Sequence, residues 1–282
     1  MTPSQSGNSL SVTKQHEIRI GTSAFTAAGW KGSFYPSAMK PAEFLTFYAT
    51  RFNTVEVDST YYRTPSASTV AGWAAKTPGD FIFSLKVPQQ ITHEKVLVDC
   101  EKDFENFVEV VSGLGKKLGP MLLQFPYFNR AKFKAGSEFT ARLQPFLKRL
   151  PKGYRFALEI RNKNWLDTKF ADLLREHGVA LACIDQAWMP SIEEVTAKID
   201  PITADFCYVR WLGDRKGIEL ETKVWDKTII DRSAALIKWV KFFHSIIHKV
   251  DIYAYANNHY AGHGPATVEL FKKLWEKQTQ TD

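Results

Sequence analysis

The chain has 282 residues, of which 44% are hydrophobic and 13% aromatic, enough to bury a large core. Lysine and arginine outnumber acidic residues by 37 to 30, and the formal net charge of +7 is spread along the chain. The excess of positive charge mildly favours anionic partners. Because it is not gathered in one block, it does not indicate a nucleic-acid-binding protein by itself. The widely separated Cys100, Cys183 and Cys207 exclude a disulfide framework and a thiolate metal site, and they suit a reducing compartment.

The beginning of the chain is polar and rich in serine and threonine. Met1 to Glu17 contain no apolar run of the kind that a signal peptide needs. No stretch of the chain approaches the roughly 20 apolar residues of a membrane span. We therefore expect a cytoplasmic protein without a membrane partner. Residues 1–16 are expected to form a disordered polar tail, and residues 17–282 a single folded domain.

Short runs rich in β-branched and aromatic residues alternate with amphipathic stretches along the chain. The runs predict eight strands, at 17–23, 53–59, 80–87, 119–125, 155–160, 179–185, 205–212 and 250–257. The amphipathic stretches predict helices, at 41–52, 68–76, 104–117, 137–150, 168–178, 228–247 and 265–277. Between the sixth and seventh strands, residues 188–204 lack a clear helical pattern.

Strands that alternate with helices predict an α/β protein with parallel pairing. Eight such units predict a single (β/α)8 barrel of the TIM type, with its active site at the carboxyl ends of the strands. A doubly wound open sheet is the alternative. The turn after the first strand, Gly21-Thr22-Ser23-Ala24-Phe25, is not the G-x-G-x-x-G turn typical of dinucleotide-binding sheets, so the barrel is favoured.

Polar residues occur on one face near the ends of most predicted strands. Side chains alternate along a strand, so Glu56 shares a face with Asp58 in TVEVDST, and Glu159 shares one with Arg161 in RFALEIRN. Other late positions hold Lys86, Gln124, Arg210, Asn257, Asn258 and His259. An unpaired buried charge costs several kcal/mol, so these groups must be paired with each other or hydrated. The mouth of a barrel meets both conditions.

The leading hypothesis for these residues is proton transfer on a small polar or anionic, sugar-like substrate. Glu56 or Glu159 would be the general base. The cations that stabilise the developing negative charge would be Lys86, Arg161 and Arg210. Side-chain amides would orient substrate hydroxyls, at Gln124, Asn257 and Asn258. His93, just after the third strand, is expected to act as an acid, a base or an anion contact, with a plain loop histidine as the alternative.

Other interpretations remain open. Glu56 and Glu159 would suit glycoside hydrolysis if their separation fits, and aromatic residues would then supply sugar platforms at Trp30, Tyr61, Trp165, Trp211 and Tyr260, unless these rings simply fill the core. A Schiff base at Lys86 is disfavoured because neighbouring carboxylates raise the pKa of a lysine. The same charges would also fit a structural ion-pair layer, or a barrel that binds nucleic acid or another anion without catalysis.

No cofactor is predicted. A divalent metal at Glu56, Glu159, Asp185 and His259 is the alternative, but arginine and lysine among these groups would repel a cation. His259 and His263 have the i, i+4 spacing of a zinc-binding helix. Their segment, NNHYAGHGP, contains two glycines and a proline and therefore predicts a loop.

The chain resembles domain-of-unknown-function family 72, the YecE-like proteins, in seven segments: GTSAFTAAGWKGSFYP, FNTVEVDSTYYRTP, FSLKVPQQITHE, LLQFPYF, ALEIRNKNW, YVRWLG and YAYANNHYAGHGP. The resemblance runs from about residue 18 to the C-terminal helix. It implies a TIM-type barrel, sometimes grouped with sugar isomerases, with no settled activity. The implied family positions are Glu56, Thr60, Tyr61, Lys86, His93, Gln124, Pro126, Glu159, Arg161, Trp165, Arg210, Asn257, Asn258 and Gly262. We expect substrate contacts at Tyr61, His93, Gln124, Trp165, Asn257, Asn258 and His259.

Overall fold

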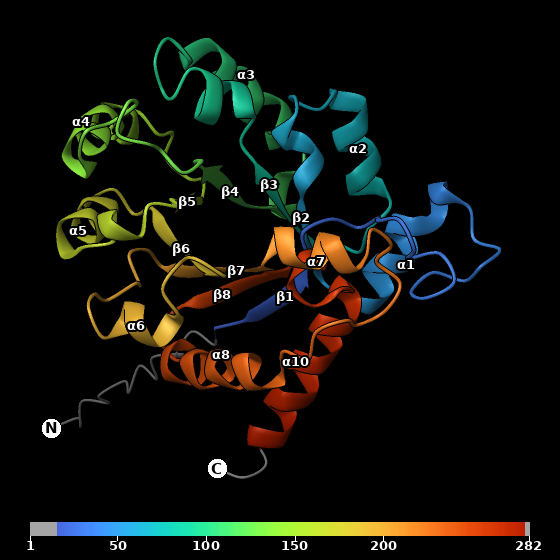
Figure 1. The fold of residues 1–282 in the computed structure, drawn as a ribbon. Coiled ribbons are helices and arrows are strands. Elements are labelled where there is room, and N and C mark those ends of the chain that lie inside the picture. The colour runs from blue at the N-terminus through green and yellow to red at the C-terminus, as the bar shows by residue number, and fades with distance from the viewer. Residues whose placement is uncertain (1–15, 280–282) are drawn as a thin grey trace, which may run out of the picture.

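In the computed structural model, which describes residues 16–279, all eight predicted strands form one parallel sheet. In the order β1-β8-β7-β6-β5-β4-β3-β2, the first two strands form the two edges of the sheet. The sheet curls into a nearly closed barrel, which brings these edges together (Figure 1). The (β/α)8 prediction is confirmed. The strands are β1 (Ile18–Thr22), β2 (Thr54–Val57), β3 (Ile82–Lys86), β4 (Leu118–Gln124), β5 (Phe156–Glu159), β6 (Ala180–Gln186), β7 (Phe206–Gly213) and β8 (Asp251–Ala256).

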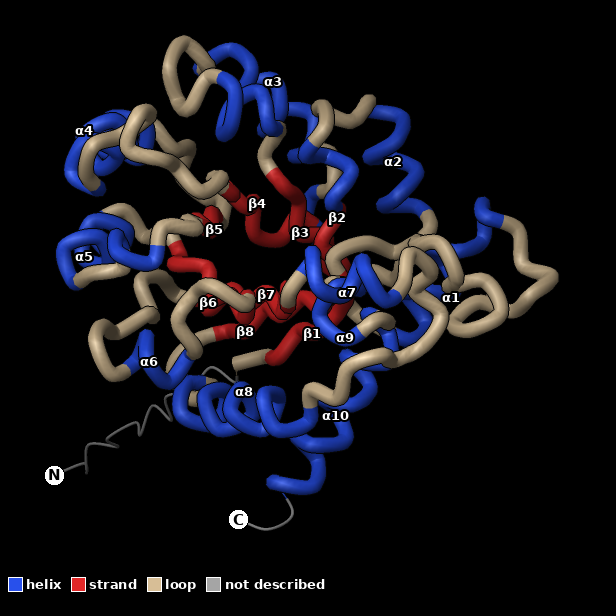
Figure 2. Tube along the Cα trace, in the orientation of Figure 1, coloured by secondary structure: helices blue, strands red, loops and turns tan. Residues whose placement is uncertain are grey.

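Helices surround the central ring of strands (Figure 2). The outer helices are α1 (Phe44–Arg51), α2 (Ala67–Ala75), α3 (Glu101–Ser112), α4 (Gly136–Leu147), α5 (Thr168–Glu176), α6 (Ile192–Thr196), α8 (Ser233–Ile246) and α10 (Gly264–Thr279). Short helical turns follow or precede several strands: η1 (Pro41–Glu43), η2 (Asp58–Tyr61), η3 (Gln90–Glu94), η4 (Gly115–Lys117) and η5 (Lys163–Trp165). Two further short helices are α7 (Arg215–Glu221) and α9 (Asn258–Ala261).

Of two segments with unusual helical content, the first agrees with the sequence expectation and the second differs from it. The region 188–204 holds only the short α6, which begins at a capping box between Ser191 and Glu194. The prediction of a loop at NNHYAGHGP is wrong for Asn258–Ala261, which form α9. The side chain of Asn257 caps this helix, and the left-handed Gly262 ends it. Local capping therefore outweighs the helix-breaking composition.

Between β1 and β2, the barrel is closed by a side chain that bridges the two backbones, instead of by a ladder of backbone hydrogen bonds. The hydroxyl of Tyr48 accepts from the backbone N of Thr22 at 2.9 Å and donates to the backbone O of Thr54 at 3.1 Å. A Cβ at Gly21 would lie 2.0 Å from the same carbonyl oxygen of Thr54. The close approach of the two strands therefore requires glycine at this position.

The barrel interior becomes more polar toward the carboxyl ends of the strands. Its apolar part is a separate cluster of buried residues: Leu122, Ala157, Ala180, Ala182, Phe206, Tyr208, Tyr253 and Tyr255. The hydroxyl of Tyr255 lies 2.9 Å from Oγ1 of Thr54 and 2.7 Å from Oγ of Ser84, which satisfies three buried hydroxyls at once. Such alternating inward positions are typical of a TIM-type barrel.

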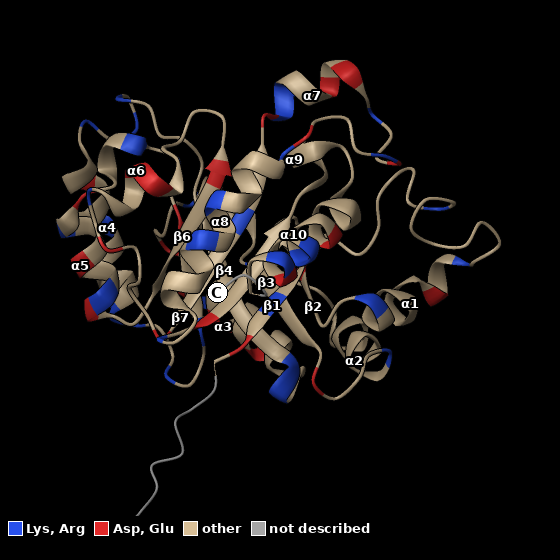
Figure 3. Cartoon of the chain, turned by 90° about the horizontal axis from the view of Figure 1, so that it is seen from below, with Lys and Arg blue, Asp and Glu red and all other residues tan. Residues whose placement is uncertain are grey.

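The outer helices carry charges of both signs. In Figure 3, acidic and basic segments are interspersed over the elements drawn. Exposed pairs include Arg149 with Glu101 and Lys238 with Glu193. No helix within residues 16–279 is long and apolar enough to cross a bilayer. The expected disordered tail, apart from its last residue, lies outside the described residues.

Candidate active site at the mouth of the barrel

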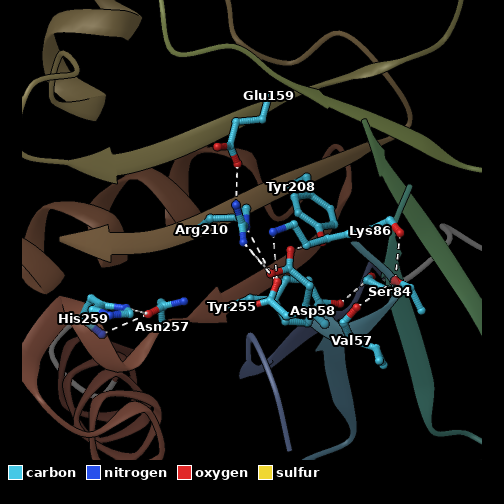
Figure 4. A network of polar contacts seen from close by, with 12 residues as sticks. Val57, Asp58, Ser84, Lys86, Glu159, Tyr208, Arg210, Tyr255, Asn257 and His259 are labelled. Carbon is cyan, nitrogen blue, oxygen red and sulfur yellow. Dashed lines mark hydrogen bonds and ion pairs between the residues drawn. The ribbon is translucent and has the colours of Figure 1, made fainter. Parts of the chain in front are cut away.

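A single arginine in β7 joins two buried carboxylates (Figure 4). Arg210 donates to Oε1 of Glu56 from Nε and Nη2, over 3.1 and 2.7 Å, and to Oε2 of Glu159 from Nη1, over 2.7 Å. The other oxygen of Glu56 accepts from the hydroxyl of Tyr208 at 2.6 Å. The other oxygen of Glu159 accepts from Nε of Arg161 at 2.9 Å. Glu56 and Glu159 have no exposed surface and Arg210 is 2% exposed, so the two carboxylates do not reach the wall of any cavity open to solvent.

The two buried carboxyls differ in proton affinity although they share one arginine. Burial raises the pKa of Glu159, but the charges of Arg210 and Arg161 outweigh it and lower this pKa to about 2. Burial also raises the pKa of Glu56, and here the charge of Arg210 does not compensate fully. Glu159 is therefore firmly ionised, and it fixes both arginines in position.

Asp58 is the carboxylate of this network that reaches solvent. It begins η2, directly after β2, and one third of its side chain is exposed (33%). Its Oδ1 lies 3.2 Å from Nζ of Lys86 and 3.7 Å from Nη2 of Arg210. The ammonium of Lys86 also lies 4.8 Å from the ring centre of Tyr61. The hydroxyl of Thr60 donates to the backbone O of Lys86 at 2.8 Å and so ties η2 to the end of β3.

A cavity of about 480 Å³, here called the mouth cavity, opens above the network at the carboxyl ends of the strands. Its volume is within the range of small-molecule sites. It is lined by Asp58, Tyr61, Tyr62, Lys86, His93, Gln124, Pro126, Tyr127, Arg161, Gln186, Trp188, Arg210, Leu212, Arg215, Asn257 and His259. Eight of the twelve predicted site residues therefore line one cavity, and Glu56 and Glu159 lie beneath it.

His93 enters the mouth cavity from η3, a single π-helical turn after β3. Its Nδ1 lies 2.8 Å from the hydroxyl of Thr92, and the ring of Tyr61 meets it edge-on at 5.0 Å. Burial, together with the charges of Lys86 and Arg161, lowers the pKa of His93 to about 4. The imidazole is therefore neutral near pH 7 and available to donate or accept a hydrogen bond.

The ends of β4 and β8 supply amides to the cavity. The Oδ1 of Asn257 accepts from the backbone N of His259 at 3.0 Å and lies 2.6 Å from its Nδ1. The Nε2 of His259 is 2.9 Å from Oε1 of Glu219 in α7, which joins α9 to α7. Burial lowers the pKa of His259, although the hydrogen bond with Glu219 opposes this effect. Gln124 donates from Nε2 to the backbone O of Phe125 at 3.2 Å.

Two of the expected substrate-binding residues do not line the mouth cavity. The Oδ1 of Asn258 accepts from Nε1 of Trp30 at 3.1 Å and from the backbone N of Gly264 at 2.8 Å, so this amide fixes the first loop and the start of α10. Trp165 stacks on the ring of Phe139 at 5.4 Å, within an aromatic cluster beside α4. The structure gives both side chains packing and anchoring contacts.

The exposed aromatic residues at the mouth are not those that the sequence singled out. Of the expected sugar platforms only Tyr61 lines the cavity; the rings of Trp30, Trp211 and Tyr260 are buried in the core. The cavity instead exposes Tyr62, Tyr127 and Trp188. Each of these follows the end of a strand or its helical turn by a few residues, which is the signal that would have identified them.

The geometry does not favour the metal and glycosidase alternatives. Glu56 and Glu159 both bind Arg210, so neither carboxylate is free for the two roles of a glycosidase pair. Asp185 accepts hydrogen bonds from Trp239 and Tyr260 instead of pointing to the cavity. No cluster of three or more His, Cys, Asp or Glu side chains that could hold a metal ion occurs in the described part of the chain.

The fold and the charged mouth place the chain among (β/α)8 barrel proteins with a polar site at the carboxyl ends of the strands. The family model described as "Protein of unknown function DUF72" matches residues 19–282. The chain belongs to this family, as its sequence motifs predicted.

Two curated relatives are similar over part of their length. The UPF0759 protein YecE of Escherichia coli is 33% identical over 115 residues, which is 41% of this chain and 40% of YecE. The UPF0759 protein YunF of Bacillus subtilis is 29% identical over 150 residues, 50% of this chain and 51% of YunF. The chain thus matches about half or less of the length of these relatives.

Solved structures match nearly the whole chain. The crystal structure of a DUF72 family protein from Thermotoga maritima has a TM-score of 0.70 at 28% identity, and the match covers 93% of this chain and all of that one (100%). A DUF72 family protein from Enterococcus faecalis also has a TM-score of 0.70, at 19% identity, over 92% of this chain and 95% of its own. The second likeness concerns the fold alone.

Proposed function

We propose that this protein is an enzyme that transfers a proton on a small anionic, sugar-like substrate bound in the mouth cavity. The observation that carries the proposal is the guanidinium group of Arg161. Its Nε is held by Glu159, and within residues 16–279 no acceptor is hydrogen-bonded to its two terminal nitrogens. With 24% of the side chain exposed beside the cavity, these nitrogens are available to a carboxylate or phosphate, which a guanidinium binds through two parallel hydrogen bonds.

The other cavity residues support a division of roles. Asp58 is the general base, because it is the carboxylate of the network with exposed surface. Lys86 lies next to it and stabilises negative charge that develops on a substrate oxygen. Gln124 and Asn257 orient substrate hydroxyls from the ends of neighbouring strands. The base role that the sequence gave to Glu56 or Glu159 passes to Asp58 in this proposal.

The buried carboxylates then act as supports for the cations. Glu159 binds Arg161 and Arg210 at once, and Glu56 binds Arg210 through two further hydrogen bonds. Side chains held in this way do not need to reorganise when charge develops in the transition state, which is the main source of electrostatic catalysis. A layer that only closed the barrel would not need an arginine with unpaired nitrogens at the cavity.

Deuterium exchange tests the proposed reaction. A panel of sugar phosphates and sugar acids is incubated with the protein in D2O, and NMR follows exchange at carbons next to a carbonyl or carboxylate. We expect exchange in at least one compound. Asp58→Asn should slow it by about 10²- to 10⁴-fold, the usual contribution of a general base. Asp172→Asn, at an exposed carboxylate of α5, is the matched control and should retain the rate.

A binding measurement accompanies the exchange assay. Arg161→Gln should weaken phosphate binding in calorimetry by about ten-fold or more, since a charged hydrogen-bonding group is lost. Arg175→Gln removes the same charge from an exposed pair on α5 and should leave binding unchanged. Exchange in none of the compounds, or a wild-type rate in the folded Asp58→Asn protein, would overturn the proposed function.

A further inference from the structure

We infer that the substrate carries a ring, which stacks on aromatic side chains at the rim of the mouth cavity while its anionic group binds Arg161. This inference rests on the proposed function and names its substrate class more closely. The rim consists of Tyr62, Tyr127 and Trp188, and these side chains are 72%, 65% and 44% exposed. Each of them lines the mouth cavity.

The distribution of exposed aromatic side chains is uneven. Among the described residues, four Phe, Tyr or Trp side chains are exposed, and three of these form the rim. The fourth, Tyr154, lines cavities that share no residue with the mouth. Single exposed apolar residues are common on protein surfaces and need no explanation, but three around one polar cavity are typical of a binding site.

The strand order places one rim residue on each side of Arg161. Tyr127 follows β4 and Trp188 follows β6, and β5 pairs with both of these strands. Arg161 comes two residues after the end of β5, so its loop begins between the loops that carry the two rings. A ligand whose anionic group binds Arg161 therefore has aromatic surface within reach on both sides. Tyr62 follows η2 and lies beside Tyr61, with ring centres 5.2 Å apart.

The loops that carry the rings are anchored by hydrogen bonds within the protein. The backbone N and O of Phe128, next to Tyr127, are both bonded by the amide of Asn162, at 2.9 and 2.8 Å. On the other side, the backbone N of Met189 donates to the O of Gln186 at 3.0 Å and closes a tight turn around Trp188. Stacking on rings with a fixed backbone costs little conformational entropy.

The size of the cavity and an unpaired amide also indicate more than a simple anion. At about 30 Å³ per water molecule, 480 Å³ has room for about 16 water molecules, far more than one phosphate group fills. Gln186, at the end of β6, is 7% exposed, and its Oε1 has no hydrogen-bond partner in the part of the chain that the structure describes. An unpaired buried acceptor is destabilising, and a hydroxyl on the ring would satisfy it.

Calorimetric titration with four probes tests the inference. Inorganic phosphate and glycerol 3-phosphate carry the anion alone, whereas phenyl phosphate and glucose 6-phosphate add an aromatic or a sugar ring. We expect at least one ring-bearing probe to bind about two- to ten-fold more tightly than glycerol 3-phosphate, the range of one ring contact. The probe that binds more tightly shows whether the substrate's ring is aromatic or a sugar.

Variants separate the rim from the anion site. Trp188→Ala and Tyr127→Ala should remove the gain from the ring and leave the affinity for glycerol 3-phosphate unchanged, and Tyr154→Ala should change neither. Arg161→Gln should weaken every probe. If Arg161→Gln acts but the rings bring no gain, or the gain survives both rim variants, the inference is wrong and the proposed function stands. If no probe binds, or Arg161→Gln has no effect, the proposed function fails as well.

Discussion

At the scale of single residues, the mouth depends on how Arg210 is paired. Arg210 is almost completely buried between Glu56 and Glu159, and a buried charge is tolerated only with such partners. Glu159 has a second partner in Arg161, so one carboxylate links a buried cation to a cation at the cavity. Glu159 is therefore expected to support the folded barrel as well as the site.

We therefore expect Glu159→Gln to destabilise the protein. The pKa of Glu159 is lowered from 4.5 to about 2 in the folded state, which corresponds to roughly 3 kcal/mol of stability when the carboxylate is ionised. Because the folded-state pKa is the lower one, this stability is present above about pH 4.5 and is lost as the pH falls toward 2. Urea unfolding at several pH values should show a deficit of the variant that shrinks over this window.

The matched control for this prediction is Glu101→Gln, which removes an exposed carboxylate paired with Arg149. Exposed ion pairs contribute little to stability, so this variant should unfold like the wild type at every pH. If Glu159→Gln unfolds like the control, the buried ion pairs of Glu159 do not stabilise the barrel, and the prediction is wrong.

At the scale of elements, the strands deliver charges and the following loops fix their surroundings. After η3, the residues Val96, Leu97 and Asp99 adopt left-handed backbone conformations, with φ of 46°, 66° and 47°. Such conformations are costly for residues other than glycine, above all for a β-branched valine. Val96 and Leu97 are buried in the core, which holds this segment in place. This segment therefore fixes the end of η3, the turn that carries His93 to the cavity.

Gly262 offers a sharp test at this scale because it ends α9, which carries His259 into the cavity. Its φ is +107°, and a Cβ there would lie 2.6 Å from the backbone O of Lys227. Gly262→Ala should lower the free energy of unfolding by at least about 2 kcal/mol, from backbone strain and the contact together. Gly79→Ala is the matched control, since its Cβ would meet nothing within 4 Å. Equal thermal midpoints for the two variants would contradict this reading of the turn.

At the scale of the whole molecule, alternation along the chain predicted much of the architecture. Eight apolar runs separated by amphipathic stretches identified the barrel, and the period of two along the strands predicted an inward direction for Glu56 and Glu159. Arg210 was expected near them because it comes late in the seventh strand. These residues meet because parallel strands bring their carboxyl ends together. Local patterns thus predicted the direction in which each strand side chain points.

Depth along the barrel axis could not be predicted in this way. Glu56 and Asp58 lie on the same face, two residues apart, yet one is fully buried and the other reaches solvent. The difference depends on how far each strand extends beyond its neighbours, which is a property of the complete sheet. The direction of the loops could not be predicted either. Trp165 and Tyr127 both follow strand ends, but Trp165 packs against α4 and Tyr127 faces the mouth cavity.

The most direct test of the central claim, that the mouth binds an anion through Arg161, is a crystal soaked in tungstate and measured for anomalous scattering. We predict a peak within hydrogen-bonding distance of the terminal nitrogens of Arg161. The cavity at the opposite end of the strands is lined by Lys116, Lys152 and Arg155 and provides the comparison. A peak there with none at Arg161, or no peak at either place, would contradict the account.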